Sequence, residues 1–142
     1  MNAEYTPSSA LVVVDMQHDF ADPTGSLYVR GGETIVGPIT AEITAARDAG
    51  ATVVYTQDWH PAHTPHFATD GGLWPVHCVA ESAGAALVPG LPVAGPLLRK
   101  GTGTEDGYSG FSEVDLATGA TKGTDLSTIL DEAGVMDITV VG

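Results

Sequence analysis

Residues 11–15 read Leu11-Val12-Val13-Val14-Asp15, four aliphatic residues in a row followed by one acid. An aliphatic run that does not alternate with polar residues predicts a strand buried on both faces, as in a parallel sheet. Asp15 would then lie at the carboxyl end of that strand, where open α/β sheets bind their ligands. The stretch therefore predicts an α/β fold with a carboxylate at its functional edge.

The next segments predict a strand–helix–strand unit. A helix is predicted over residues 33–49, because isoleucines recur there every four positions and form one apolar stripe. Pro38 is tolerated only in the first turn of a helix, so the helix should begin near Val36 or Gly37. Gly50 ends it, and residues 52–56 form a second strand. This order predicts a right-handed crossover and parallel pairing of the two strands.

The rest of the chain extends the same sheet. The remaining predicted elements are an irregular segment over residues 60–95 with short helical turns near 82–88, a strand over 96–100, a Gly- and Thr-rich loop over 101–123, a helix between Asp125 and Gly134, and a strand over 137–142. Three strands thus deliver a charged residue at or near their carboxyl ends, namely Asp15, Asp58 and Lys100. Because parallel strands end at the same edge of a sheet, we expect these three residues to lie close together.

Length and composition limit the classes of protein that this chain can belong to. The 142 residues predict a single domain. No apolar run approaches the roughly 20 residues of a membrane span, and the first residues lack the pattern of a signal peptide. The net charge of −13 would repel a phosphate backbone, which argues against a nucleic-acid partner. The single cysteine, Cys78, cannot form an internal disulfide, so a cytoplasmic location is expected.

The segment that follows the second strand is unusually rich in metal-binding side chains. Asp58 and three histidines lie within nine residues, and His77 follows. Asp58, His60 and His66 can converge on one cation, because a loop that leaves a strand end can fold back on itself; His63 is then the spare. Two histidines with a carboxylate suit Zn²⁺, Fe²⁺ or Mn²⁺. The alternative is a polar loop that happens to contain histidines.

Asp15 and Lys100 are candidates for acid–base chemistry. Taken singly, Asp15 has a plain alternative as a helix cap or loop hydrogen-bond acceptor, and Lys100 as a solvated strand end. Placed at neighbouring strand ends, however, a carboxylate and an ammonium keep each other charged. The carboxylate can then accept a proton from a nucleophile, while the ammonium stabilises the negative charge that develops.

Five motifs together resemble those of the nicotinamidases, which belong to the isochorismatase-like cysteine hydrolases. They are Val13-Val14-Asp15-Met16-Gln17-His18-Asp19-Phe20, Gln57-Asp58-Trp59-His60, Trp74-Pro75-Val76-His77-Cys78, Arg99-Lys100-Gly101 and Tyr108-Ser109-Gly110-Phe111. The resemblance runs from about residue 10 to the last residue, with the motifs in the right order and spacing. Each motif alone would be weak, but the five together are specific.

The resemblance implies a three-layer α/β/α sandwich around a central parallel sheet. It also implies hydrolysis of nicotinamide, the small-molecule substrate, to nicotinate and ammonia in NAD salvage. The residues that match the family's functional positions are Asp15 as catalytic acid/base, Lys100 as catalytic lysine, Asp58, His60, His66 and His77 as ligands of a divalent metal, and Phe20, Trp74 and Tyr108 around the substrate ring. The family's metal is usually zinc, with iron or manganese in some members. Core packing is the alternative for the aromatic residues, and it is most serious for Phe20.

The family mechanism also needs a cysteine thiolate that attacks the amide carbon. In the family this cysteine follows the fourth strand, which here is the segment 137–142 that ends the chain. The resemblance therefore implies a single hydrolase domain over residues 1–142 that is incomplete at its carboxyl end, and that is inactive by itself. Cys78 lies inside the third motif, and we expect it to be a packing residue.

Two other functions remain open at the level of the sequence. One is an amidohydrolase of the same superfamily that acts on a different small amide. The other is a non-catalytic, metal-binding pseudoenzyme, which the missing nucleophile alone supports. The state of association is not decided either, and a homo-oligomer is left open.

Overall fold

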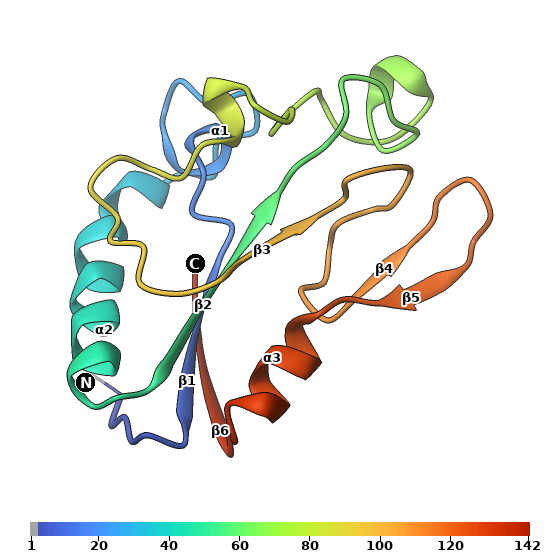
Figure 1. Cartoon of the computed structure of the whole chain (residues 1–142). Helices are drawn as coiled ribbons and strands as arrows, with labels where there is room; N and C mark the ends of the chain where they lie inside the picture. The colour runs from blue at the N-terminus through green and yellow to red at the C-terminus, as the bar shows by residue number, and fades with distance from the viewer. Residues whose placement is uncertain (1–2) are drawn as a thin grey trace.

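The computed structural model describes residues 3–142. Its helices and strands are, in chain order, β1 (Ser9–Val14), α1 (His18–Ala21), η1 (Gly32–Thr34), α2 (Val36–Asp48), β2 (Thr52–Asp58), η2 (Ala68–Asp70), η3 (Ala83–Ala85), β3 (Leu97–Lys100), β4 (Ser112–Val114), β5 (Thr121–Gly123), α3 (Leu126–Glu132) and β6 (Asp137–Val141). A four-stranded sheet in the order β3-β2-β1-β6 forms the centre, and all its neighbours are parallel (Figure 1).

Strand β1 lies inside the sheet, as its unbroken aliphatic sequence predicts. Leu11 pairs with Val53 of β2 on one side and with Thr139 of β6 on the other. All of residues 10–13 are buried. A strand with neighbours on both edges and cover on both faces needs apolar side chains at every position, which explains why this segment does not alternate.

The two main helices cover opposite faces of the sheet (Figure 1). Helix α2 packs Ile43 with Leu11 in one apolar cluster, whereas α3 packs Leu126 and Leu130 with Ala10 in another. Ala10 and Leu11 are adjacent in β1, and adjacent side chains of a strand point to opposite faces. The fold is therefore the three-layer α/β/α arrangement that we expected. Burial of each large aliphatic side chain contributes about 1.5–3 kcal/mol to this packing.

The predicted boundaries of α2 hold to within one residue, whereas those of the strands differ by one or two residues; β1, for example, begins at Ser9 and ends at Val14 instead of spanning residues 11–15. Helix α2 begins at Val36, which leaves Pro38 in its first turn, and Gly50 follows its end with a φ of 73°. That left-handed backbone conformation is unfavourable for residues with a Cβ, and it stops the helix. Strand β2 extends to Asp58, two residues beyond the predicted segment.

Two short features of the structure were not among the predicted elements. Residues 18–21 form the one-turn helix α1, and residues 112–123 contain the antiparallel hairpin β4–β5. Each strand of this hairpin has three residues, and β5 is exposed along its length, so neither carries an apolar pattern. Helical turns over residues 60–95 are confined to η2 and η3 among the described residues; η3 lies within the predicted region near 82–88, whereas η2 was not predicted.

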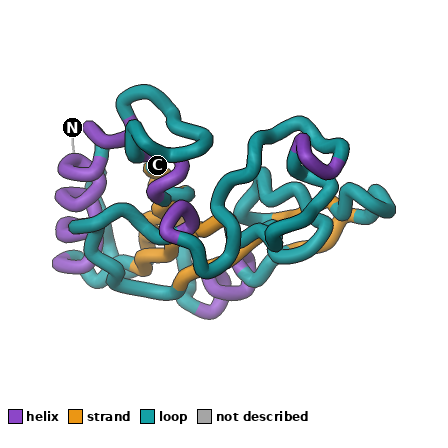
Figure 2. Tube along the Cα trace, turned by 90° about the horizontal axis from the view of Figure 1, so that it is seen from above, coloured by secondary structure: helices purple, strands orange, loops and turns teal. Residues whose placement is uncertain are grey.

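Strand β6 is the outer strand on one side of the four-stranded sheet. Val140 is 64% exposed and Ile138 is 42% exposed, which leaves an apolar surface beside an open edge. At the carboxyl edge of the sheet, in contrast, loops cover the strand ends (Figure 2). Among residues 3–142, no helix is long and apolar enough to cross a membrane.

Candidate active site and metal centre

The three charged residues at the strand ends meet, as predicted. Lys100, at the end of β3, is 1% exposed. Its Nζ donates to Asp15 Oδ2 at 2.9 Å and to Asp58 Oδ1 at 2.5 Å. The backbone carbonyl of Gly107 accepts a third hydrogen bond from the same ammonium. Lys100 thus has partners for all three of its donors without water, which a buried ammonium requires.

The surroundings of Asp15 and Asp58 shift the pKa values of these two carboxyl groups in opposite directions. Burial would lower the pKa of Lys100, but the charges of Asp15 and Asp58 raise it above its usual value. Burial raises the pKa of Asp15, against the opposing charge of Lys100. Burial would also raise the pKa of Asp58, but contacts with His60 and His77 and the charge of Lys100 hold it well below its usual range. Asp58 therefore stays ionised, and Asp15 is the carboxylate suited to take up and release a proton.

Asp15 is held in place by the neighbouring strand. Its backbone has a φ of 50°, a left-handed conformation that is uncommon for a residue with a side chain. Its N–H donates to the Thr56 carbonyl at 3.2 Å, and Thr56 Oγ1 donates to Asp15 Oδ1 at 2.7 Å. This strained turn at the end of β1 aims the carboxylate at Lys100, and strain of this kind is found at functional sites.

Three histidines gather beside Asp58. The ligand nitrogens of His60, His66 and His77 lie within 4.8 Å of one another, and all three side chains are buried. His60 Nε2 is 3.3 Å and His77 Nε2 is 3.7 Å from Asp58 Oδ2. The fourth histidine of this segment, His63, is different, because its side chain is 85% exposed and contacts Asp70 instead. The predicted ligand set is thus brought together and the predicted spare is excluded.

Hydrogen bonds orient two of these imidazoles for a cation. His60 Nδ1 donates to the Gly101 carbonyl at 2.8 Å, and His77 Nδ1 donates to the Pro75 carbonyl at 2.7 Å. In the neutral rings both Nε2 lone pairs then face Asp58 Oδ2, an oxygen that is also an acceptor. His60 Nε2 is buried and has no hydrogen-bond partner within residues 3–142. A divalent cation bound at this point would satisfy these acceptors.

His66 completes the set. Burial, together with the nearby His60 and His77, lowers the pKa of His66 to about 4. At neutral pH its ring is therefore uncharged, and it offers a lone pair that no proton occupies. Three imidazoles with a carboxylate beside them are a donor set that fits a divalent metal ion.

A cavity of about 320 Å³ is lined by both carboxylates and by two of the three histidines, whereas Lys100 and His60 are not among its lining residues. The predicted site residues that line it are Asp15, Asp58, His66, His77, Phe20, Trp74 and Tyr108. Trp74 Nε1 donates to Tyr108 Oη at 2.7 Å, and this pair forms one aromatic wall. Phe20 lines the cavity with its ring 5.4 Å from that of His77, so it is not a residue of the apolar core. Apolar walls with a few convergent polar groups are typical of small-molecule sites.

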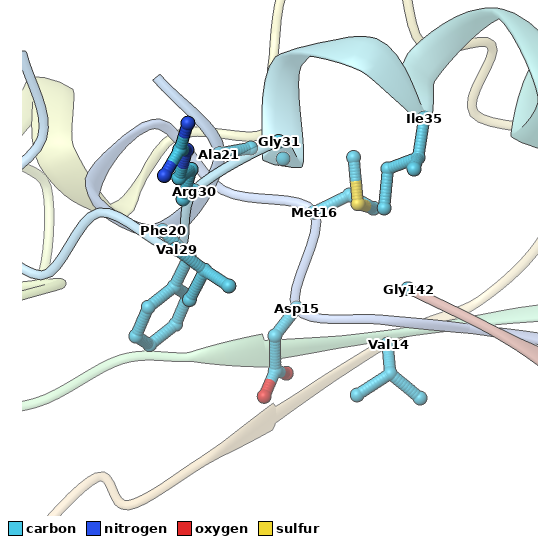
Figure 3. A pocket seen from close by; sticks show the side chains of 11 residues that line it. Val14, Asp15, Met16, Phe20, Ala21, Val29, Arg30, Gly31, Ile35 and Gly142 are labelled. Carbon is cyan, nitrogen blue, oxygen red and sulfur yellow. The ribbon is translucent and has the colours of Figure 1, made fainter. Parts of the chain in front are cut away.

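A second, mostly apolar cavity of about 400 Å³ lies on the other side of Asp15 (Figure 3). Met16, Ile35 and Gly142 line it, and Asp15 and Phe20 belong to both cavities. The Asp15 carboxylate points away from Met16 and Ile35 in this view. Asp15 therefore stands at the boundary between two spaces, one beside the histidines and one beside the end of β6.

Residues that act on the site through the backbone were not predicted. Gln17 is fully buried, and its side-chain amide donates to the Asp58 carbonyl at 2.8 Å and accepts the Asp58 N–H at 2.8 Å. Gln17 lies in the first of the five motifs, but the resemblance implies no role for it. Asp106 also lines the first cavity, and Glu113 accepts the Gly101 N–H at 2.7 Å. Both lie in the segment expected to be a loop, where no periodic pattern marks a buried acid.

Cys78 does not face either of these cavities. It is fully buried, and its backbone has a φ of 47° and donates its N–H to Asp19 Oδ2 at 2.8 Å. Burial raises the pKa of its thiol well above the usual value, so the thiol remains protonated at neutral pH. This is the environment of a packing residue and not that of a nucleophile.

Comparisons with known proteins agree with this geometry. The family described as the isochorismatase domain matches residues 9–142. The nicotinamidase of Acinetobacter baylyi is 36% identical over an alignment of 152 positions, gaps included, which covers 94% of this chain and 67% of that protein. The structure of PnC1 from L. infantum in complex with nicotinate matches with a TM-score of 0.85 and 36% identity, over 100% of this chain and 70% of that one. The pyrazinamidase of Pyrococcus horikoshii in complex with zinc matches with a TM-score of 0.77 and 36% identity, over 96% of this chain and 72% of that one.

Proposed function

Because this chain belongs to the isochorismatase family, we propose that it carries the site of a nicotinamidase-type amidohydrolase, which converts nicotinamide to nicotinate and ammonia. One observation carries the proposal: Asp15, which is paired with Lys100, lines the same small cavity of about 320 Å³ as two of the three clustered histidines, His66 and His77. The similarity to a nicotinate-bound relative supports this substrate. In a cell, the reaction would serve NAD salvage.

The roles of the two charged residues follow from their pKa shifts. Asp15 accepts the proton of an attacking thiol, and the thiolate forms a bond to the amide carbon. When the carbon–nitrogen bond breaks, Asp15 returns the proton to the leaving nitrogen, and ammonia departs. Water then hydrolyses the thioester. Lys100, 2.9 Å from Asp15, stabilises negative charge through this sequence and keeps the carboxylate in position.

The other residues of the cavity bind and orient the substrate. His60, His66 and His77 would hold zinc, with Asp58 beside them; the ion supplies an electrophilic anchor for the ring nitrogen of nicotinamide. Similarity to a zinc-bound relative supports this choice of metal. Phe20, Trp74 and Tyr108 provide apolar area on which a flat pyridine ring can be buried.

The attacking thiol is the remaining requirement. Cys78 is the single cysteine of residues 1–142, and it is buried away from the site. Strand β6 runs beside β1, with Val141 paired to Val13, so its end lies next to Asp15. The end of β6 therefore lines the mostly apolar cavity of Figure 3 together with Asp15, which leaves space for a thiol beside the acid–base residue.

The experiment that tests the proposed function is a binding and turnover assay on the purified chain. Calorimetry should detect binding of nicotinamide, but not of acetamide, to the zinc-loaded protein, because acetamide lacks the ring. Residues 1–142 alone should release no ammonia above a zinc-only control. Failure to bind nicotinamide would overturn the proposed substrate, and ammonia release by residues 1–142 would overturn the assignment of Cys78 as a packing residue.

A further inference from the structure

One buried acid lies outside the site described above and is not used by its chemistry. Glu113, on β4, is 6% exposed. Its Oε1 accepts the Gly101 N–H at 2.7 Å, and its Oε2 lies 3.5 Å from Nζ of the exposed Lys122. A carboxylate is costly to bury, and it is retained where its hydrogen bonds compensate for the lost water. The hydrogen bond to Gly101 is therefore the contact to explain.

Gly101 connects this acid to the metal centre. Its N–H is held by Glu113, and its carbonyl accepts the hydrogen bond from His60 Nδ1 at 2.8 Å. Its backbone has a φ of 63°, and a Cβ at this position would collide with the His60 ring. The residue that orients His60 is thus a glycine in a left-handed conformation, which has little conformational preference of its own.

We propose that Glu113 is a positioning residue for the metal centre: by fixing Gly101 it keeps the His60 ring turned with Nε2 toward the cation. This inference rests on the metal site of the proposed function. The same hydrogen bond also fixes the peptide bond between Lys100 and Gly101, whose carbonyl accepts the N–H of Trp59 at 2.9 Å. Outer groups that orient metal-binding histidines in this way affect metal affinity about 10- to 100-fold.

A purely structural role in the β4–β5 hairpin is the competing explanation, and Glu105 provides a matched control. Glu105 also forms an ion pair with Lys122 and also accepts a backbone N–H, from Gly103 at 2.8 Å. It does not contact Gly101. Substitution of Glu105 removes a hairpin contact of the same kind but leaves the connection to His60 intact.

The test is the zinc affinity of the full chain, measured by competition with a chromophoric chelator. Glu113→Met fills the same space without an oxygen acceptor and should weaken zinc binding about tenfold, at the lower end of the range for outer groups. Glu113→Gln retains an acceptor for the Gly101 N–H and should restore most of the affinity. Glu105→Met should bind zinc like the unsubstituted protein. The visible bands of the Co²⁺-loaded protein should shift in Glu113→Met alone.

Each outcome bears on a different claim. If the unsubstituted chain binds no zinc, the metal site fails and this inference fails with it. If it binds zinc and Glu113→Met binds it equally well, the proposed function stands and only the role of Glu113 is overturned. Should Glu113→Met not fold, by circular dichroism, Glu113→Asp replaces it. Its carboxylate is one methylene shorter, so it should also weaken zinc binding, and unchanged affinity would overturn the inference.

Discussion

Two lysines among the described residues each bridge two carboxylates, and they lie in opposite environments. They are Lys100, between Asp15 and Asp58, and Lys122, between Glu105 and Glu113. Lys100 is 1% exposed at the end of β3, an outer strand of the four-stranded sheet, whereas the side chain of Lys122 is 58% exposed on a hairpin. The ionic pattern is the same, so the difference between them isolates the effect of burial.

When an ion pair is buried, each charge needs its partner for the protein to remain stable. At the surface, water and salt can replace a lost partner, and such pairs contribute little to stability. In the interior, loss of one partner leaves a charge that nothing else neutralises. The charge of Lys100 is therefore required by its buried neighbours, whereas the charge of Lys122 is not.

The largest effect should follow from removal of the buried lysine. Lys100→Met leaves Asp15 and Asp58 buried without a counter-ion and should lower the free energy of unfolding by about 3–5 kcal/mol. Lys122→Met is the matched control and should leave that free energy nearly unchanged. Urea denaturation of both variants at pH 7 measures the difference. Equal losses of unfolding free energy in the two variants would contradict the claim that burial makes the two lysines different.

The same contrast applies to the histidines. His60→Ala removes a buried ligand and should weaken zinc binding by more than about 100-fold, beyond the effect of an outer group. His63→Ala removes the exposed histidine and should leave zinc affinity unchanged. Competition with a chelating dye measures both constants. A comparable loss in His63→Ala would mean that the loop binds the metal through a different set of ligands.

A smaller effect is expected at the mouth of the cavity. Trp74→Phe keeps an aromatic ring but removes the donor to Tyr108 Oη. Tyr108 is 61% exposed, so water can replace the lost bond, and a net cost of about 1 kcal/mol corresponds to roughly fivefold weaker binding of nicotinamide. Calorimetry on the zinc-loaded protein provides the measurement. If Trp74→Phe binds nicotinamide as tightly as the unsubstituted protein, the Trp74–Tyr108 pair does not contribute to the substrate site.

The smallest effect sharpens the comparison of the two lysines. In 1 M salt the screening length is about 3 Å, so exposed ion pairs are largely screened while buried ones are much less affected. Any difference in the free energy of unfolding between Lys122→Met and the unsubstituted protein should therefore vanish in 1 M salt. The difference between Lys100→Met and the unsubstituted protein should persist. Denaturation curves at low and high salt test this. Loss of the Lys100 effect in salt would show that water reaches the cluster.

The parts of the fold that could be predicted from the sequence were those with a repeating pattern. The aliphatic run of β1 and the isoleucine stripe of α2 predicted a parallel sheet, and parallel strands necessarily brought Asp15 and Lys100 to one edge. The metal-binding segment was visible because its histidines are crowded. Hairpin β4–β5 was missed, because strands of three residues with β5 exposed carry no pattern.

The hydrogen bonds that hold the site could not be predicted. Gln17 and Glu113 act by binding the backbone of Asp58 and Gly101. A hydrogen bond to the backbone does not depend on the side chain of the residue that is contacted, so the sequence does not reveal it. Both connect positions that are distant along the chain, so their role depends on the finished fold and not on the local sequence.

The most direct test of the central claim is the visible absorption spectrum of the Co²⁺-loaded protein during titration with nicotinamide. The claim is that the histidine cluster and the aromatic cavity form one site. The account predicts Co²⁺ bands that shift when nicotinamide is added, and that remain unchanged with benzamide, which lacks the ring nitrogen. Absence of the bands, or an equal response to both amides, would contradict it.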